Sequence, residues 1–340
     1  MSKTRWGILS TGYIAGMLAE GLSVVEDAEL VAVGSRSQAN ADAFADTWGA
    51  PHRHASYEAL AADPDVDVIY VATPHPYHYE NTMMCLNAGK HVLVEKPFAM
   101  NARQAGEMVA LARQKGLFLM EAMWTRFTPA MAQVRQWLAA GAIGDVQLVR
   151  ANLSFNIDFN PESRLFKPEL GGGAMLDVGI YPISFAFMVL GTPTSVYSTA
   201  TLGPTGTDDR SAYMFGYDGG KTAQLSSAVR LNVPVEADII GTDGMIKIHQ
   251  AWINPRKITL GKLAPEGVVN RLIVEGRLYD TETLHIPTEG NGYNYEVMEV
   301  GRCIQAGKQE SDIMPLDQSL AIMRTMDTIR GQWGLTYPNE

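Results

Sequence analysis

The sequence predicts an α/β domain with a doubly wound parallel sheet over residues 1–122, followed by an α+β domain with a large, open-faced, mostly antiparallel sheet over residues 123–315. Three observations indicate this fold class. Apolar segments alternate with helical patterns up to residue 121. Central segments there, such as VDVIYVAT and HVLVE, are almost continuously apolar, as in parallel strands covered on both faces. Beyond residue 145 the segments alternate apolar and polar residues and are joined by glycine turns, which favours antiparallel strands.

The elements of the first domain follow one another in a regular order. The expected strands cover residues 5–10, 29–35, 66–73, 91–95 and 117–121. The expected helices cover residues 14–24, 39–48, 57–62, 77–88 and 102–115. The ligand of such a domain lies at the carboxyl ends of the strands, so the residues that follow each strand are the first candidates for a site.

The second domain is expected to begin with a helix over 127–141 and a long strand over 146–157. Further strands are expected at 195–202, 211–217, 222–231, 236–241, 245–249 and 257–260, with helices over 171–190 and 293–306. Helices should cover one face of this sheet and a second subunit the other, because a broad apolar face is rarely left in water. The loop over 158–170 is a candidate lid. The final segment, 316–340, should form a helix that returns to the first domain.

Composition limits the function classes. The chain has 340 residues and a net charge of −10 at pH 7, so nucleic acid is not expected as its main partner. Cys85 and Cys303 both lie in helical patterns, and two cysteines cannot form a disulfide framework. We find no targeting segment and no apolar run of membrane-spanning length. The expected location is therefore the cytoplasm.

The stretch GILSTGYIAG, residues 7–16, joins the first expected strand to the first helix. Its small residues read Ser10-x-Gly12-x-x-Ala15, close to the G-x-G-x-x-G/A pattern of a dinucleotide site, in which backbone N–H groups at a helix N-terminus face the pyrophosphate. A structural turn would also fit this pattern. The candidate cofactor residues are Ser10, Thr11, Gly12, Tyr13 and Ile14.

The end of the second strand indicates which dinucleotide binds. An NAD site usually has an acidic residue there for the ribose 2′-OH, but residues 30–40 contain neither Asp nor Glu. Ser35 and Arg36 stand there instead, and a guanidinium can bind a 2′-phosphate. We therefore predict NADP, with NAD possible and a merely solvated arginine as the alternative.

Two further strand ends carry reactive side chains. The segment ATPHPYH, residues 72–78, is expected to place Thr73, Pro74, His75 and His78 against the cofactor. A metal site is not expected, because no nearby cysteine or carboxylate completes the ligand set. The next strand ends in Glu95 and Lys96. Lys96 either points into the cleft or is solvated, and Lys96–Pro97 is a candidate cis peptide.

In the second domain, the segment GGGAMLDVGIYP, residues 171–182, places Asp177 and Tyr181 four residues apart on one helix face. A capping aspartate and a tyrosine at the edge of the core would give the same pattern. As a site, Tyr181 would carry a proton, Lys96 would lower its pKa, and Asp177 would orient Lys96 or a substrate hydroxyl.

With these motifs and EAMWTRF, residues 121–127, the sequence resembles the glucose-fructose oxidoreductase, inositol dehydrogenase and rhizopine-catabolism (Gfo/Idh/MocA) family over nearly its whole length. Within that family it looks most like the dihydrodiol dehydrogenases and the NADP-dependent D-xylose dehydrogenases. The resemblance implies an N-terminal Rossmann domain, catalytic Lys96 and an acid/base role for Tyr181, where many relatives carry histidine. It also implies that Asp177 lines the site and that subunits pair across the open sheet. More loosely, it places Trp124, Arg126 and Phe155 near the substrate.

These observations favour an NADP-dependent oxidoreductase that transfers hydride between the nicotinamide and a sugar or a cyclic polyol or diol. Two alternatives remain: a reductase of keto- or anhydro-sugars, and a non-catalytic regulator that senses NADP. The expected assembly is a homodimer or a higher homo-oligomer.

Overall fold

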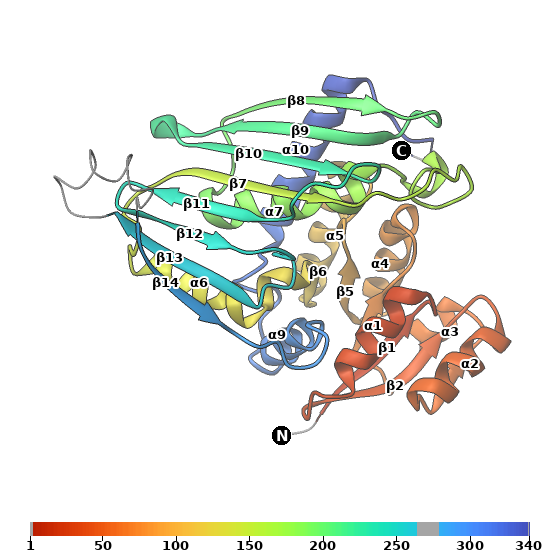
Figure 1. Cartoon of the computed structure of the whole chain (residues 1–340). Coiled ribbons are helices and arrows are strands. Elements are labelled where there is room, and N and C mark those ends of the chain that lie inside the picture. Colours follow the sequence, from red (N-terminus) through yellow and green to blue (C-terminus); the bar gives the residue numbers. More distant parts are fainter. Residues whose placement is uncertain (1–2, 264–278, 339) are drawn as a thin grey trace.

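The computed structural model describes residues 3–263, 279–338 and 340. These residues form two sheets, and Figure 1 shows the large second sheet with α6 and α7 beneath it, facing the first domain. The first sheet has the strand order β3-β2-β1-β4-β5-β6, and the second has the order β14-β13-β12-β11-β7-β10-β9-β8. The predicted fold class is confirmed.

The first domain is a doubly wound parallel sheet. Its strands are β1 (Thr4–Leu9), β2 (Ala28–Gly34), β3 (His52–His54), β4 (Val68–Val71), β5 (His91–Glu95) and β6 (Leu119–Ala122). Its helices are α1 (Tyr13–Leu22), α2 (Gln38–Trp48), α3 (Tyr57–Ala61), α4 (His78–Asn87) and α5 (Ala102–Lys115). Because β1 lies between β2 and β4, the strand order reverses beside β1, and the ligand crevice of such a sheet opens at that point.

Strand β3 was not predicted from the sequence. It has only three residues, two of them histidines, and so carries no apolar pattern. His52 Nδ1 and His54 Nε2 lie 2.7 and 2.8 Å from one carboxylate oxygen of the buried Asp63. Polar contacts of this kind leave no periodic signal in the sequence.

The second domain is a mixed sheet with helices on its inner face. Its strands are β7 (Val146–Ser154), β8 (Ser195–Leu202), β9 (Asp208–Gly216), β10 (Thr222–Ala228), β11 (Ala237–Gly241), β12 (Gly244–Ile248), β13 (Lys257–Leu263) and β14 (Tyr279–His285). The helices of this half are α6 (Pro129–Ala139), α7 (Ile180–Leu190), α9 (Asn294–Gln305) and α10 (Leu316–Trp333). Only β7 and β10 pair in parallel. The edge strand β14 was not predicted because most of its residues are exposed and polar.

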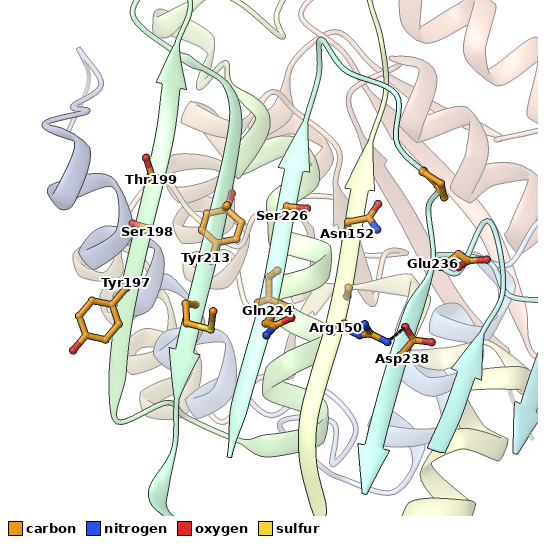
Figure 2. Close-up of a pocket in the computed structure, with 15 residues that line it drawn as sticks. Arg150, Asn152, Tyr197, Ser198, Thr199, Tyr213, Gln224, Ser226, Glu236 and Asp238 are labelled. Atoms are coloured by element: carbon orange, nitrogen blue, oxygen red, sulfur yellow. Dashed lines mark hydrogen bonds and ion pairs between the residues drawn. The ribbon is translucent and has the colours of Figure 1, made fainter. Parts of the chain in front are cut away.

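The two faces of the large sheet differ in composition. Tyr213, Phe215 and Leu225 are buried on the inner face. On the outer face, Figure 2 shows Arg150 and Asn152 on β7, Gln224 and Ser226 on β10, and Tyr197, which is 68% exposed, on the edge strand β8. This surface is mainly polar, so the expectation of a broad apolar face was wrong; the alternation of each strand places its polar residues outward.

One apolar segment is long enough to cross a membrane, contrary to our expectation. The segment Pro168–Leu190 has 23 residues; its most apolar 18-residue window has a mean hydropathy of 1.7, and 83% of that window is buried inside the protein. This segment contains α7, which packs against β7 and β10. Its apolar character is that of a buried core helix that packs against the inner face of the large sheet.

Helix α10 contacts the first domain. Ser319 Oγ on α10 donates to Glu121 at 2.8 Å, and Asp327 accepts from the backbone N–H of Ala102 at 2.8 Å. The same helix also packs against β8 of the large sheet. Helix α10 therefore fixes the two sheets relative to each other.

Candidate active site

The turn between β1 and α1 has the backbone of a pyrophosphate site. Ser10 adopts φ 97°, a conformation that glycine adopts without strain, so the serine keeps the shape expected of the first glycine position. Gly12 caps α1, and a Cβ built on it would meet no atom within 4 Å. Thr11 and Ile14 are half-buried beside it, and Tyr13 is 84% exposed. The open space over a helix N-terminus fits a pyrophosphate.

The end of β2 presents one cation. Ser35 is buried, and its backbone N–H donates to the carbonyl of His54 at 3.0 Å. Arg36 is exposed and makes no ion pair within the described part of the chain. The nearby Asp46 is bound instead by Arg53, at 2.7 Å. Arg36 therefore remains able to bind an anion.

The loop after β4 is fastened to its neighbours by two histidines. His78 Nδ1 lies 2.8 Å from the carbonyl oxygen of Pro97, and Nε2 lies 2.8 Å from that of Thr73. His75 Nδ1 lies 3.2 Å from the carbonyl oxygen of Gly171 in the second domain. Burial lowers the pKa of His75 to about 3 and of His78 to about 4. Their ring nitrogens thus hold the wall of the site together, while Pro74 is exposed on it.

Lys96 joins the two domains, directly after β5 and the buried Glu95. Its Nζ donates to the backbone oxygen of Asp177 at 2.7 Å and lies 3.4 Å from the Asp177 carboxylate. The same Nζ lies 5.0 Å from the ring centroid of Tyr181. The predicted cluster of Lys96, Asp177 and Tyr181 is therefore present, and Lys96–Pro97 is cis.

An irregular helix turn makes the Asp177 backbone available. Residues Met175–Gly179 form a π-helical turn directly before α7. The backbone oxygen of Asp177 in this turn accepts from Lys96 Nζ, so the irregular turn provides the docking point for the lysine.

The charges of the cluster determine its protonation. Burial lowers the pKa of Lys96. Tyr181 and the carboxylates of Asp177 and Glu95 together raise this pKa by more than burial lowers it, so the ammonium is retained. Burial raises the pKa of Asp177, but the charges of Lys96 and Arg164 lower it well below its usual range. For Tyr181, burial raises the pKa more than Lys96 lowers it. Lys96 therefore lowers the pKa of Tyr181, as expected, but burial outweighs its charge, so in the free protein Tyr181 keeps its proton at neutral pH.

Known proteins share this architecture. A family model for an oxidoreductase family with an NAD-binding Rossmann fold matches residues 4–123, and a model for the GFO/IDH/MocA C-terminal domain matches residues 131–247. The trans-1,2-dihydrobenzene-1,2-diol dehydrogenase of Xenopus tropicalis is 39% identical over 98% of this chain and 99% of its own length. The human protein of that name is 34% identical over 99% of this chain and 98% of its own length.

The chain belongs to the Gfo/Idh/MocA oxidoreductase family. It is an NAD(P)-dependent oxidoreductase. Among solved structures, aldose-aldose oxidoreductase from Caulobacter crescentus has a TM-score of 0.84 at 24% identity and covers 98% of each chain. A 3-ketoreductase from Actinomadura kijaniata, solved in complex with NADP, has a TM-score of 0.80 at 23% identity and covers 97% of each chain. These two similarities concern the fold.

Arg164 contacts the cluster of Lys96, Asp177 and Tyr181, which the sequence did not reveal. It lies in the expected lid loop, and its guanidinium is 3.0 Å from the Asp177 carboxylate. The loop is packed rather than free, because Phe166 is fully buried and lies edge-on to Phe159 at 5.2 Å. In the sequence, the only hint of a packed loop is an apolar residue, Phe166, two residues after Arg164.

The three predicted substrate residues have different surroundings. Trp124 is close to the cluster, and its indole N–H donates to the Tyr181 hydroxyl at 3.0 Å. Arg126 is buried, and its guanidinium donates to the hydroxyl and the carbonyl of Ser184 at 2.9 and 2.6 Å and to Gln318, so it links helices and does not reach the cluster. Phe155 is 41% exposed directly after β7, at the start of the loop that carries Arg164.

Replacing Gly12 by valine is expected to weaken NADPH binding at least about tenfold while the protein still folds. The site has room for the side chain in the protein itself, but the branched Cβ would stand where the pyrophosphate must approach. Fluorescence titration with NADPH measures the affinity. Gly331→Val on α10 is the matched control, because Gly331 also has no neighbour within 4 Å. Equal NADPH affinity in the Gly12→Val and Gly331→Val variants would contradict the assignment of this turn.

Proposed function

We propose that this oxidoreductase uses NADP and acts on a C–O(H) group of a sugar or of a cyclic polyol or diol. The observation that carries the proposal is the position of Lys96 Nζ, which contacts Asp177 and lies over the ring of Tyr181. The relatives named for trans-dihydrodiol oxidation support a vicinal diol as substrate. Phe155, which is 41% exposed, offers aromatic surface for a ring-shaped substrate.

The residues divide the work between charge and proton transfer. A bound nicotinamide supplies or accepts the hydride. The Lys96 ammonium stabilises negative charge on the reacting oxygen, since its positive charge is retained. The Tyr181 hydroxyl exchanges the proton of that oxygen. Asp177 keeps Lys96 in place and accepts a hydrogen bond from a neighbouring hydroxyl, which a diol or a sugar provides.

The protonated state of Tyr181 favours one direction at neutral pH. Because burial raises its pKa, the phenol is ready to donate a proton to a carbonyl oxygen, as the reduction of a keto-sugar or an aldose requires. Oxidation requires the phenolate and gains from higher pH. Carbonyl reduction is therefore the second candidate function, on the same residues.

A substrate panel tests the proposal. Reduction of NADP⁺ is followed by nicotinamide absorbance with aldoses, polyols and cyclic trans-diols, and NADPH oxidation with the corresponding carbonyl compounds. Turnover on one substrate group names the substrate class. Tight NADPH binding without turnover on any of them would overturn the proposal.

Replacing Arg36 by alanine is expected to raise KM for NADP⁺ by about 10- to 100-fold and to leave KM for NAD⁺ nearly unchanged. The reason is that Arg36 is exposed, is not paired within the described residues, and directly follows Ser35 after β2, from where a guanidinium can bind a 2′-phosphate. Arg53→Ala, which removes a neighbouring arginine held by Asp46, serves as the control. An equal loss for both cofactors would refute the assignment of NADP.

A homodimer through the outer face of the large sheet is part of the proposal. This face is free of helices within the described chain and has a hollow of about 690 Å³ across β7, β8, β9 and β10 (Figure 2). Tyr197 and Met214, 68% and 44% exposed, flank it. The free, buried Cys85 and Cys303 are compatible with a reducing compartment such as the cytoplasm.

Light scattering coupled to size-exclusion chromatography tests this assembly. We expect a dimer mass for the native protein and a monomer mass for the double variant Tyr197→Glu, Met214→Glu, because buried carboxylates at the interface oppose association. Tyr77→Glu, at an exposed tyrosine of the first domain that is 42% accessible, is the control. A monomer mass for the native protein would refute the dimer.

A further inference from the structure

Tyr181 is held by a chain of aromatic side chains behind it. The indole N–H of Trp124 donates to its hydroxyl at 3.0 Å. The other end of the arrangement is Tyr293, whose ring stacks on the Trp124 ring with centroids 4.9 Å apart and planes 16° apart. All three rings are buried, at 8%, 7% and 8% exposed for Tyr181, Trp124 and Tyr293. Burial on both sides leaves the indole little freedom to rotate.

The backbone of the segment that carries Tyr293 also packs closely against Trp124. Gly292 has φ 102°, and a Cβ built on it would lie 3.0 Å from the Trp124 ring. Its N–H donates to the side chain of Asn294 at 3.1 Å. Only glycine fits here, so the backbone closes against the indole edge while Tyr293 covers the indole face.

The same segment is fixed to α1, the helix that follows the phosphate turn. Asn291 donates to the carbonyl of Met17 at 2.7 Å and to Glu20 at 3.0 Å. Gly21 on α1 allows the close approach, since a Cβ there would lie 2.9 Å from the backbone nitrogen of Asn294. The position of Tyr293 is therefore set by the helix at the cofactor turn.

We propose that Trp124 and Tyr293 are positioning residues for Tyr181: the indole N–H of Trp124 fixes the phenol oxygen, and Tyr293 fixes the indole. The inference rests on the proposed acid/base role of Tyr181. An N–H donor stabilises the phenolate more than the phenol, so Trp124 assists the loss of the phenol proton. Because Trp124 gives its only donor to Tyr181, it has no hydrogen bond left to offer a substrate.

The test compares pH profiles of oxidation by NADP⁺. Trp124→Phe keeps a ring but loses the N–H, and is expected to lower kcat about tenfold and to shift the alkaline rise of kcat upward by about one pH unit, with a smaller change in KM. Tyr293→Leu should shift the profile in the same direction, and Tyr293→Phe, which keeps the stacked ring, should restore it. Trp333→Phe is the matched control, because the Trp333 indole N–H has no partner within the described structure and its ring stacks on Tyr213.

A second measurement does not depend on turnover. Tyrosine Cζ carbons are labelled with ¹³C, the Tyr181 signal is assigned from its loss in Tyr181→Phe, and its titration is followed in Trp124→Phe and in Tyr293→Leu. An upward shift of the Tyr181 titration supports the inference, and a profile and titration unchanged in both Trp124→Phe and Tyr293→Leu would overturn it. Failure of the native protein to turn over any substrate would instead refute the proposed function and leave this titration readable.

Discussion

Replacement of Lys96 by methionine is expected to lower kcat at least about 1,000-fold while NADPH still binds. Lys96 is the cation closest to Tyr181, and its Nζ makes its polar contacts with Asp177 of the other domain. Methionine fills a similar volume without the charge, so the negative charge that develops on the reacting oxygen loses its partner. Single-turnover measurement of NADPH oxidation, with NADPH affinity measured by fluorescence, separates the chemical step from binding.

Lys90→Met is the matched control for this variant. Lys90 precedes β5 just as Lys96 follows it, and its Nζ donates to the backbone oxygen of Val66 at 2.8 Å and to that of Asp63. Its loss should lower the thermal unfolding midpoint and leave kcat nearly unchanged. If Lys96→Met kept more than about a tenth of the native kcat, the ammonium would not be the group that stabilises the transition state.

The parts of the fold that the sequence predicted are those with a periodic apolar pattern. The buried strand β4 is apolar throughout and β5 has an apolar centre, as expected of parallel strands covered on both faces. Strands β3 and β14 were not predicted, because they are defined by backbone pairing with β2 and β13 and not by a buried apolar pattern. Backbone hydrogen bonds to a neighbour far away in the chain are not encoded in local composition.

The site divides in the same way. Lys96, Asp177 and Tyr181 could be predicted because each follows a strand or shares a helix turn, and these elements fix their position. Arg126 and Arg164 could not be told apart, since an arginine has the same sequence signature whether it binds Ser184 inside the core or Asp177 at the site. The direction of the net pKa shift of Tyr181 could not be predicted either, because it depends on how strongly burial removes water from the phenol.

Tyr181→Phe is expected to lower kcat by about 100- to 10,000-fold and to remove the pH dependence that the phenol imposes. Burial raises the pKa of Tyr181 above its usual value, and Lys96 lowers it less. In the native protein, oxidation therefore requires the minor phenolate form and should still rise towards about pH 10, whereas reduction requires the phenol and should stay level through neutral pH and fall only above that pKa. The phenylalanine variant should show neither trend, in initial rates measured in both directions.

The control for this variant is Tyr79→Phe, which removes a hydroxyl bound to Glu107 on α5, outside the cluster. It should keep both pH trends of the native protein. If Tyr181→Phe also kept them, the titrating group would have to be another member of the cluster. Asp177 is held ionised by Lys96 and Arg164 over the whole range, which leaves the Lys96 ammonium, and the lysine would then carry the proton as well as the charge.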